Sequence, residues 1–286
     1  MLRKITAILL GTCMILGLAA CGGGAADSEK ATEVPEKVTV TIFAAKSLNG
    51  VVDELIAAYK EENPEAEIVA NYDSSGTLME QIKEGADCDI FFSAAQKQMD
   101  ILEEAGLVVE GTRKNVVNNQ VCVVTCKDSG TKVTGLADLA DAASLALADG
   151  SVPVGKYTRQ ALVNAGILSP AEDVSLITTQ EVSAALGGIE INECANVGAV
   201  TAAVAEGSNE VGTVYKSDTY GLEDRLEILE VVSYDLTGNV IYPIARISND
   251  QADESRDVLA KDFIRFLTSD TAKIFYEKYY MDTNVE

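Results

Sequence analysis

Serines stand at two places where a predicted strand runs into a predicted helix. "FAAKSLNGVVDEL" places Ser47 there, and "NYDSSGTLMEQI" places Ser74 and Ser75. Serine is favoured at a helix start because its hydroxyl can accept a hydrogen bond from a free backbone N–H. A helix start also offers unpaired N–H groups and the positive end of the helix dipole. The serines are therefore either plain helix caps or parts of a site for an oxyanion.

The composition excludes several kinds of chemistry. The 286 residues include no histidine, which removes Ser-His-Asp or Cys-His catalysis and histidine metal sites. The formal net charge of −23 argues against nucleic acid or an anionic membrane surface as a partner. An enzyme with Ser47 or Ser75 as nucleophile and Lys46 as base is an alternative, but Lys46 and Ser47 are adjacent and no SxxK spacing surrounds either serine. We expect a binding protein without a cofactor.

The chain from residue 38 alternates strands with helices. Strands are predicted at 38–45, 66–72 and 88–94, and each is followed by a run with helical spacing of apolar residues. This order calls for a parallel sheet with helices on both faces. The carboxyl ends of parallel strands meet at one edge, so the helix starts at Ser47 and Ser75 are expected to converge there.

A second unit of the same kind begins near residue 118. It contains "QVCVVTC" and "LALAD" as strands and "GLADLADAA", "GKYTRQALVNAG" and "VGAVTAAVAEG" as helices. The last strand and the two last helices are expected to complete the first unit. The predicted fold class is α/β: two lobes, each a mostly parallel sheet flanked by helices, with a ligand cleft between them. The predicted boundaries are 38–118 and 235–286 for the first lobe and 119–234 for the second.

The N-terminus has the pattern of a targeting segment. Arg3 and Lys4 precede an apolar run that is too short for a membrane span, and the run ends in "LAAC". This ending resembles a bacterial lipobox, which implies cleavage after residue 20 and acylation of Cys21. An ordinary signal peptide with a chance cysteine is the alternative. Residues 21–37 are expected to form a flexible tether that holds the protein at the outer face of the cell membrane. Removal of Arg3 and Lys4 takes the formal net charge from −23 to −25.

Four cysteines remain in the mature chain: Cys88, Cys122, Cys126 and Cys194. Four strand residues span roughly 13 Å, so Cys122 and Cys126 are too far apart for a disulfide without a bend. No CxxC pair supports a zinc site. Buried thiols are expected, and a disulfide among the four is left open.

Several segments together resemble the periplasmic-type molybdate-binding proteins of ABC importers. The first lobe carries "AAKSL", "SSGTL" and "CDIFFSAAQKQMD" in the order of that family. The second lobe carries "SVPVGKYTRQAL" and "ANVGAVTAAVAEGSNEVGTVYKSD", and the late "YPIARI" fits as well. The resemblance covers nearly all of the chain from residue 38. It implies a monomer that captures molybdate or tungstate and delivers it to a membrane permease.

The resemblance also implies which residues hold the anion. Ser47 and Ser75 would each offer a hydroxyl and a backbone N–H, Val154 and Val197 a backbone N–H, and Tyr215 a hydroxyl. Such neutral donors cannot pair with an oxyanion's own O–H, so they favour fully deprotonated anions. Binding of sulfate, a phosphonate or a ferric complex in the same fold is the alternative.

Other residues have a plainer interpretation. A tyrosine in the core is the alternative role of Tyr215. Asn196 replaces an acidic residue of the family and is expected to cap the following helix. Lys46 stands where the family has a small residue; it is expected to face solvent, with the rim of the pocket as the alternative. Tyr279 and Tyr280 are expected to lie within the terminal helix, where their side chains diverge.

Overall fold

The computed structural model describes residues 37–285 of the chain. The predicted signal peptide, Cys21 and all but the last residue of the predicted tether lie outside the described residues. No helix among the described residues is long and apolar enough to cross a membrane.

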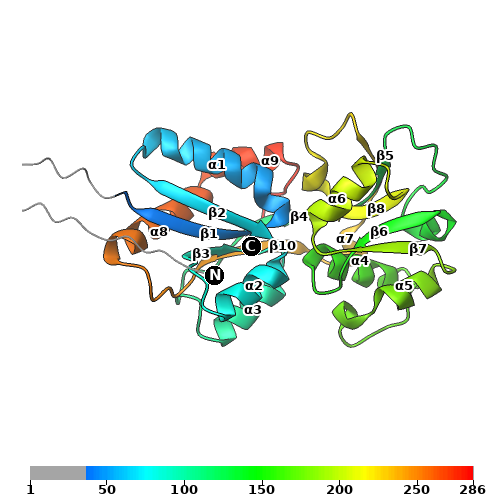
Figure 1. Ribbon diagram of the computed structural model, residues 1–286, viewed down its shortest axis with the longest axis horizontal. Coiled ribbons are helices and arrows are strands. Elements are labelled where there is room, and N and C mark those ends of the chain that lie inside the picture. Colours follow the sequence, from blue (N-terminus) through cyan, green and yellow to red (C-terminus); the bar gives the residue numbers. More distant parts are fainter. Residues whose placement is uncertain (1–36, 286) are drawn as a thin grey trace, which may run out of the picture. The chain divides into compact units, whose positions relative to one another are not determined.

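The first sheet contains five strands in the order β2-β1-β3-β10-β4 (Figure 1). Their bounds are β1 (Thr39–Ala45), β2 (Glu67–Asp73), β3 (Ile90–Phe92), β4 (Lys114–Asn119) and β10 (Val240–Arg246). β1 pairs in parallel with β2 and β3, whereas β10 is antiparallel to β3 and β4. Four strands thus run in one direction, and the one late in the sequence runs against them.

The second sheet repeats this plan in the order β7-β6-β8-β5-β9. Its strands are β5 (Val121–Cys126), β6 (Ser144–Ala148), β7 (Glu190–Cys194), β8 (Val211–Tyr215) and β9 (Leu226–Val231). Here β5 is the antiparallel strand. Each sheet with its helices is called a lobe below. Only Gln120 separates β4 from β5, and α7 (Tyr234–Thr237) lies on the return path from β9 to β10.

Helices cover both faces of the first sheet because its strands bury side chains on both faces. Val40, Ile42 and Ala44 of β1 belong to one apolar cluster, and Phe43 belongs to another, as the two-residue period of a strand requires. The Phe43 cluster is completed by α2 (Ser75–Lys83) and α3 (Gln96–Glu104). The other cluster includes α1 (Asn49–Glu62), α8 (Glu254–Leu267) and α9 (Asp270–Lys278).

The second lobe is covered by α4 (Pro153–Asn164), α5 (Thr179–Ala185) and α6 (Val197–Ala205) (Figure 1). α4 and α6 pack against β5, β6 and β8, and α5 packs against β7. The α/β class and the two-lobed arrangement of mixed sheets agree with the sequence prediction.

Two local predictions differ from the structure, the first in the kind of element and the second only in its length. The helix expected in "GLADLADAA" is a 3₁₀ segment, η2 (Leu136–Asp141), with a non-helical residue inside at Asp138. Alanine and leucine favour a helix, but the segment has only one turn on either side of that kink. The strand expected over 88–94 is paired only from Ile90 to Phe92.

The four cysteines of the described chain are free thiols, and Cys88, Cys122 and Cys194 are buried. Burial raises the pKa of Cys122 to about 12 and that of Cys88 further, so these thiols stay protonated at neutral pH. The expectation of buried thiols is confirmed for these three, whereas Cys126 is half-buried.

Arg159 of α4 is a buried cation that forms hydrogen bonds with backbone carbonyls of three separate segments. It is 1 % exposed, and its guanidinium donates hydrogen bonds to carbonyls rather than to a carboxylate. The acceptors are the carbonyl oxygens of Ile177 at 2.7 Å, Ala148 at 2.8 Å and Gly155 at 2.9 Å. Because Ala148 ends β6 and Gly155 lies in the first turn of α4, Arg159 fixes the strand-to-helix turn between them.

Replacement of Arg159 by methionine is expected to lower the free energy of unfolding by about 2–4 kcal/mol. Methionine keeps the length of the side chain but leaves buried carbonyls without donors. Urea unfolding measures the change, and Arg265→Met, at an exposed side chain of α8, is the control with an expected effect within about 0.5 kcal/mol. Equal stabilities for the two variants would contradict this role.

Candidate functional site

A small cavity lies between the two lobes, with a volume of about 10 Å³. This is about the volume that holds one water molecule. It is lined by residues of both lobes: Ala45, Lys46, Ser47, Ser74, Ser75, Ala94, Val152, Pro153, Val154, Val197 and Tyr215. The structure therefore brings together all five residues that the sequence singles out for anion binding. Ser47, Ser75, Val154, Val197 and Tyr215 are buried.

The two serines at the start of α2 have different roles. Ser74 is the N-cap residue, and its hydroxyl accepts a hydrogen bond from the N–H of Thr77 at 3.1 Å. Ser75 is the first helical residue, and its hydroxyl accepts from the N–H of Ala94 at 2.9 Å. The hydroxyl proton of Ser75 and its own backbone N–H have no partner within the helix. Ser74 is thus the cap, and Ser75 keeps two donors for another group.

Ser47 is not a helix cap, contrary to the expectation from its residue type. It lies inside η1 (Lys46–Leu48), whose N-cap residue is Ala45. Its hydroxyl lies 2.9 Å from the hydroxyl of Tyr242 in β10. The Tyr242 oxygen also accepts a hydrogen bond from the side-chain amide of Asn119 at 3.1 Å. Two strands distant in sequence thus hold the Ser47 side chain in place.

Two helix starts of the second lobe face the same cavity. Val154 is the second residue of α4 and follows Pro153, which has no N–H to leave unpaired. Val197 is the first residue of α6, and the side chain of Asn196 accepts from the N–H of Ala199 at 3.0 Å. The prediction that Asn196 caps this helix is confirmed. By position, the N–H groups of Val154 and Val197 have no partner within their helices.

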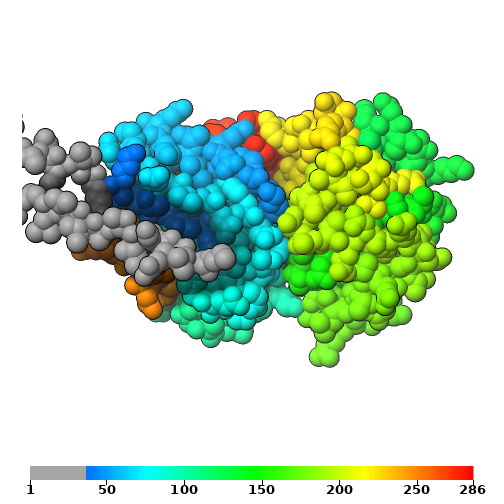
Figure 2. Space-filling view, in the orientation of Figure 1, coloured from blue at the N-terminus to red at the C-terminus, as the bar shows by residue number. Residues whose placement is uncertain are grey.

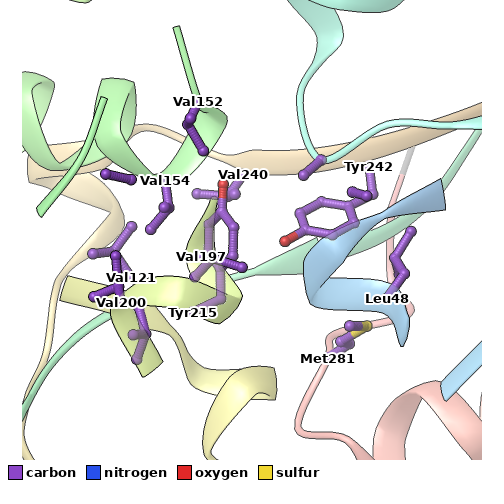
Figure 3. Packing of buried hydrophobic residues seen from close by; sticks show 14 of the residues in the cluster. Leu48, Val121, Val152, Val154, Val197, Val200, Tyr215, Val240, Tyr242 and Met281 are labelled. Atoms are coloured by element: carbon purple, nitrogen blue, oxygen red, sulfur yellow. The ribbon is translucent and has the colours of Figure 1, made fainter. Parts of the chain in front are cut away.

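Tyr215 ends β8 and brings an unpaired donor to the cavity. The residue is 1 % exposed, and its hydroxyl has no hydrogen-bond partner among the described residues. Its ring packs edge-on against Tyr242, with 5.6 Å between ring centroids, and lies between Val154 and Tyr242 in Figure 3. Burial, followed by the influence of Tyr242, raises the pKa of Tyr215 well above its usual range. The hydroxyl therefore remains a neutral donor, and a buried donor without a partner costs about 1–3 kcal/mol.

Asp218 supports Tyr215 from behind, which the sequence reasoning missed. Its carboxylate accepts a hydrogen bond from the backbone N–H of Tyr215 at 3.0 Å. Burial raises the pKa of Asp218 to about 7, while this hydrogen bond and the positive charge of Lys46 oppose the rise. The signal was present in "VYKSD", because an aspartate three residues after the strand end can cap the turn that follows.

The lobes touch on both sides of the cavity. Asn196 donates to a carboxylate oxygen of Asp73 at 3.2 Å, and the ammonium of Lys97 lies 2.8 Å from a carboxylate oxygen of Asp173. A Cβ atom on Gly76 would lie 3.1 Å from the carbonyl oxygen of Ser151. A side chain at position 76 would therefore crowd the backbone of the other lobe, which the glycine avoids. Figure 2 shows the atoms of the two lobes in contact along the face that it displays.

The donors around the cavity suit an anion rather than a cation. Hydroxyl and N–H groups line it, and the positive ends of the helix dipoles favour negative charge there. The described residues include no group of three or more His, Cys, Asp or Glu that could hold a metal ion.

The family model described as bacterial extracellular solute-binding protein matches residues 40–282. The chain belongs to this family. Its members are extracytoplasmic binding components of ABC importers, not enzymes, and they act with a membrane permease. This assignment agrees with the two-lobed type II fold and with a binding cavity between the lobes.

Relatives in the family carry specific names. A putative ABC transporter substrate-binding lipoprotein, YvgL of Bacillus subtilis, is 27% identical over 280 residues, which is 98% of each chain. The molybdate-binding protein ModA of Haemophilus influenzae is 31% identical over 82% of this chain and 86% of its own. The substrate-binding domain of a putative molybdenum ABC transporter from Clostridium difficile superposes with a TM-score of 0.62 at 31% identity, covering 87% of this chain and 99% of that structure.

The raised pKa of Asp218 predicts a specific pH dependence of stability. Between about pH 4 and pH 7 the folded state keeps a proton that the unfolded state releases, so stability falls as the pH rises through this window. Asp218→Asn removes this contribution while it keeps an acceptor for the N–H of Tyr215. The unfolding free energy of the wild type minus that of Asp218→Asn should therefore decrease as the pH rises.

Urea unfolding at pH 4.5, 6 and 7.5 measures this difference, with Asp224→Asn as the control for loss of one acidic charge in the same segment. A difference that does not change with pH would contradict the burial of the Asp218 carboxyl.

Proposed function

We propose that this protein captures a tetrahedral oxyanion, molybdate or tungstate, outside the cytoplasm and delivers it to the permease of an ABC importer. The observation that carries the proposal is the buried Tyr215 hydroxyl without a partner, in a cavity where the starts of α2, α4 and α6 meet. The names of the relatives in Haemophilus influenzae and Clostridium difficile support the same ligand.

Five residues hold the anion in this proposal. Ser75 and Ser47 give it a hydroxyl and a backbone N–H each, Val154 and Val197 give a backbone N–H, and Tyr215 gives its hydroxyl. The Ser75 oxygen already accepts from Ala94, so its proton is directed elsewhere. When the anion binds, the Ser47 hydroxyl donates its hydrogen bond to the anion, and its oxygen can still accept a hydrogen bond from the hydroxyl of Tyr242.

The cavity's size and chemistry favour a small, fully deprotonated anion. At about 10 Å³ the closed cavity has room for about one water molecule, so the lobes must part for any tetrahedral oxyanion and must part further for an organic phosphonate or a chelated ferric ion. Among its side chains, hydroxyl groups and one ammonium can donate hydrogen bonds, and no carboxylate lines it. A protonated oxyanion would place its own O–H against these donors and leave it unpaired. Sulfate shares the shape and charge of molybdate and is the competitor that a titration must separate.

Capture requires the lobes to open and close. We place the hinge at the two crossings between the sheets, with residues 38–118 and 235–286 in one lobe and 119–234 in the other. One crossing contains only Gln120 between strands, and the other contains the single turn of α7. A few residues at the ends of elements are the usual place for such a hinge.

The attachment to the membrane is a second part of the proposal. Acylation of Cys21 after removal of residues 1–20 would hold the protein beside its permease, and the word lipoprotein in the name of the Bacillus subtilis relative supports this. The protein acts as a monomer in this proposal, because the cavity is lined from a single chain.

Tyr215→Phe is expected to separate binding from stability. The loss of one hydrogen bond to an anion should weaken molybdate binding by about 1.5–3 kcal/mol, which isothermal titration measures. The same change should leave the stability of the ligand-free protein unchanged or higher, because the hydroxyl that it removes is unpaired.

Tyr242→Phe is the matched control. Its hydroxyl has partners in Ser47 and Asn119, so this variant should lose stability without ligand. Titrations with molybdate, tungstate and sulfate in parallel identify the ligand. Absence of molybdate and tungstate binding to the wild type, or full molybdate affinity in Tyr215→Phe, would contradict the proposal.

Cys21→Ala should move the protein from the membrane fraction to the soluble fraction. An acyl chain supplies about 0.8 kcal/mol per buried CH₂ group, and no helix of the described chain is long and apolar enough to replace it by spanning a bilayer. Fractionation of cells that express each form measures the distribution, and molybdate affinity should be unaltered. Cys13→Ala, within the predicted signal peptide, is the control and should remain in the membrane fraction.

A further inference from the structure

Lys46 stands at the wall between two cavities. It lines the anion cavity together with Ser47, and both residues also line a neighbouring cavity of about 310 Å³. Lys46 is partly buried, and its place among the residues that line both cavities fits the alternative interpretation, a charge at the rim of the pocket. Among the residues that line the anion cavity in the described chain, Lys46 alone carries a charge.

The stem of Lys46 is fixed by the second lobe. A Cβ atom on Gly198, the second residue of α6, would lie 2.9 Å from Cε and 3.0 Å from Cγ of Lys46. The absence of a side chain at Gly198 therefore leaves the space in which the lysine stem lies. Because this contact joins the two lobes beside the start of α6, Lys46 takes part in closing the cavity.

The charge of Lys46 is not cancelled by an ion pair. Its ammonium donates to the neutral side-chain oxygen of Asn49 at 3.3 Å, and within the described part of the chain it forms no contact with a carboxylate inside 4.0 Å. Several other lysines, such as Lys97 and Lys278, do have such partners. The positive charge of Lys46 therefore acts on its surroundings over several ångströms.

The carboxyl group of Asp218 gives the positive charge of Lys46 a role in anion binding. It lines the neighbouring cavity with Lys46 and binds the backbone of Tyr215. Near neutral pH its carboxyl is partly ionised, since burial raises its pKa to about 7. A negative charge behind Tyr215 repels a dianion, and the neutral donors of the cavity supply dipoles but no full positive charge. The positive charge of Lys46, which also acts on Asp218, offsets this repulsion.

We infer that Lys46 is a specificity-determining residue that favours doubly charged over singly charged tetrahedral oxyanions. The inference rests on the proposed function, because it concerns the same cavity. The ammonium attracts a dianion about twice as strongly as a monoanion of similar size, since Coulomb energy scales with the product of the charges. The hydroxyl and N–H donors recognise the tetrahedral shape that both kinds of anion share, and Lys46 discriminates between a double and a single negative charge.

Molybdate and perrhenate form a suitable pair of probes, since both are tetrahedral oxyanions and their charges are −2 and −1. Lys46→Met keeps most of the stem and removes the charge. We expect molybdate affinity to fall by roughly tenfold in Lys46→Met and perrhenate affinity by roughly threefold. Isothermal titration measures molybdate directly, and competition against bound molybdate measures perrhenate even where its binding is weak.

Two variants control the experiment. Lys60→Met removes the same charge from an exposed position in α1 and should leave the ratio of the two affinities at the wild-type value. Lys46→Arg keeps the charge and should keep the preference for molybdate. The salt dependence of molybdate affinity is an independent measurement: it should be weaker in Lys46→Met than in wild type, because salt screens the interaction that the variant lacks.

The outcomes separate this inference from the proposed function. If wild-type protein does not bind molybdate or tungstate, the proposed function fails. If wild type binds molybdate and Lys46→Met weakens both anions by the same factor, or weakens neither, the charge of Lys46 does not determine specificity and the inference is overturned. Thermal unfolding of each variant confirms that the comparison is between folded proteins.

Discussion

Buried polar groups must be paired, and this constraint shapes the region between the lobes. The cavity is surrounded by helix starts whose N–H groups have no partner in their own helices, and an unpaired buried group costs about 1–3 kcal/mol. Some donors and acceptors find partners in the protein, as Ser47 does in Tyr242 and Ser75 does in Ala94. Tyr215 finds none. A ligand that only accepts hydrogen bonds supplies what this region lacks.

The topology brings these helix starts together twice over. In the first sheet, β1 and β2 are parallel neighbours, and their carboxyl ends lead into η1 and α2. In the second sheet, β6 and β7 are parallel neighbours, and their ends lead into α4 and α6. Because each pair delivers two helix starts to one sheet edge, the two edges facing each other form a cavity with donors on opposite sides. The same plan in each lobe thus produces one shared site.

Local patterns in the sequence were enough for most elements and for the serines at the cavity, whereas Val154, Val197 and Tyr215 were identified only through the resemblance to a known family. Alternation of apolar strands and amphipathic helices predicts the first lobe, and "DSSGTL" predicts the start of α2. β7 was missed because it is an edge strand with the largely exposed sequence "EINEC", which lacks the apolar alternation of a central strand. The N-terminal predictions concern residues that the structure does not describe.

The failures at single residues have a common cause, which is contact between segments far apart in sequence. Ser47 resembles a cap, but its hydroxyl is taken by Tyr242, 195 residues later. Tyr279 and Tyr280 continue a helical pattern, yet α9 ends at Lys278 and Tyr280 has a φ of 61°. Both rings instead contact Tyr220 of the second lobe. A local sequence pattern cannot identify such a distant partner, so the contacts of these residues could be determined only from the folded structure.

Closure of the lobes follows from the same balance of polar groups. The ion pair of Lys97 with Asp173 joins the lobes, but both side chains are more than a third exposed, and such pairs contribute about 1 kcal/mol at most. Closing without a ligand removes the Tyr215 hydroxyl from water and leaves it unpaired, which costs at least as much. In the proposed function, closing over an anion would pair this hydroxyl and the free N–H groups of α2, α4 and α6 at once. An anion that takes donors from both lobes would add to this ion pair and to the other contacts between the lobes, such as Asn196 with Asp73 and Tyr220 with Tyr279, and so would favour the closed form.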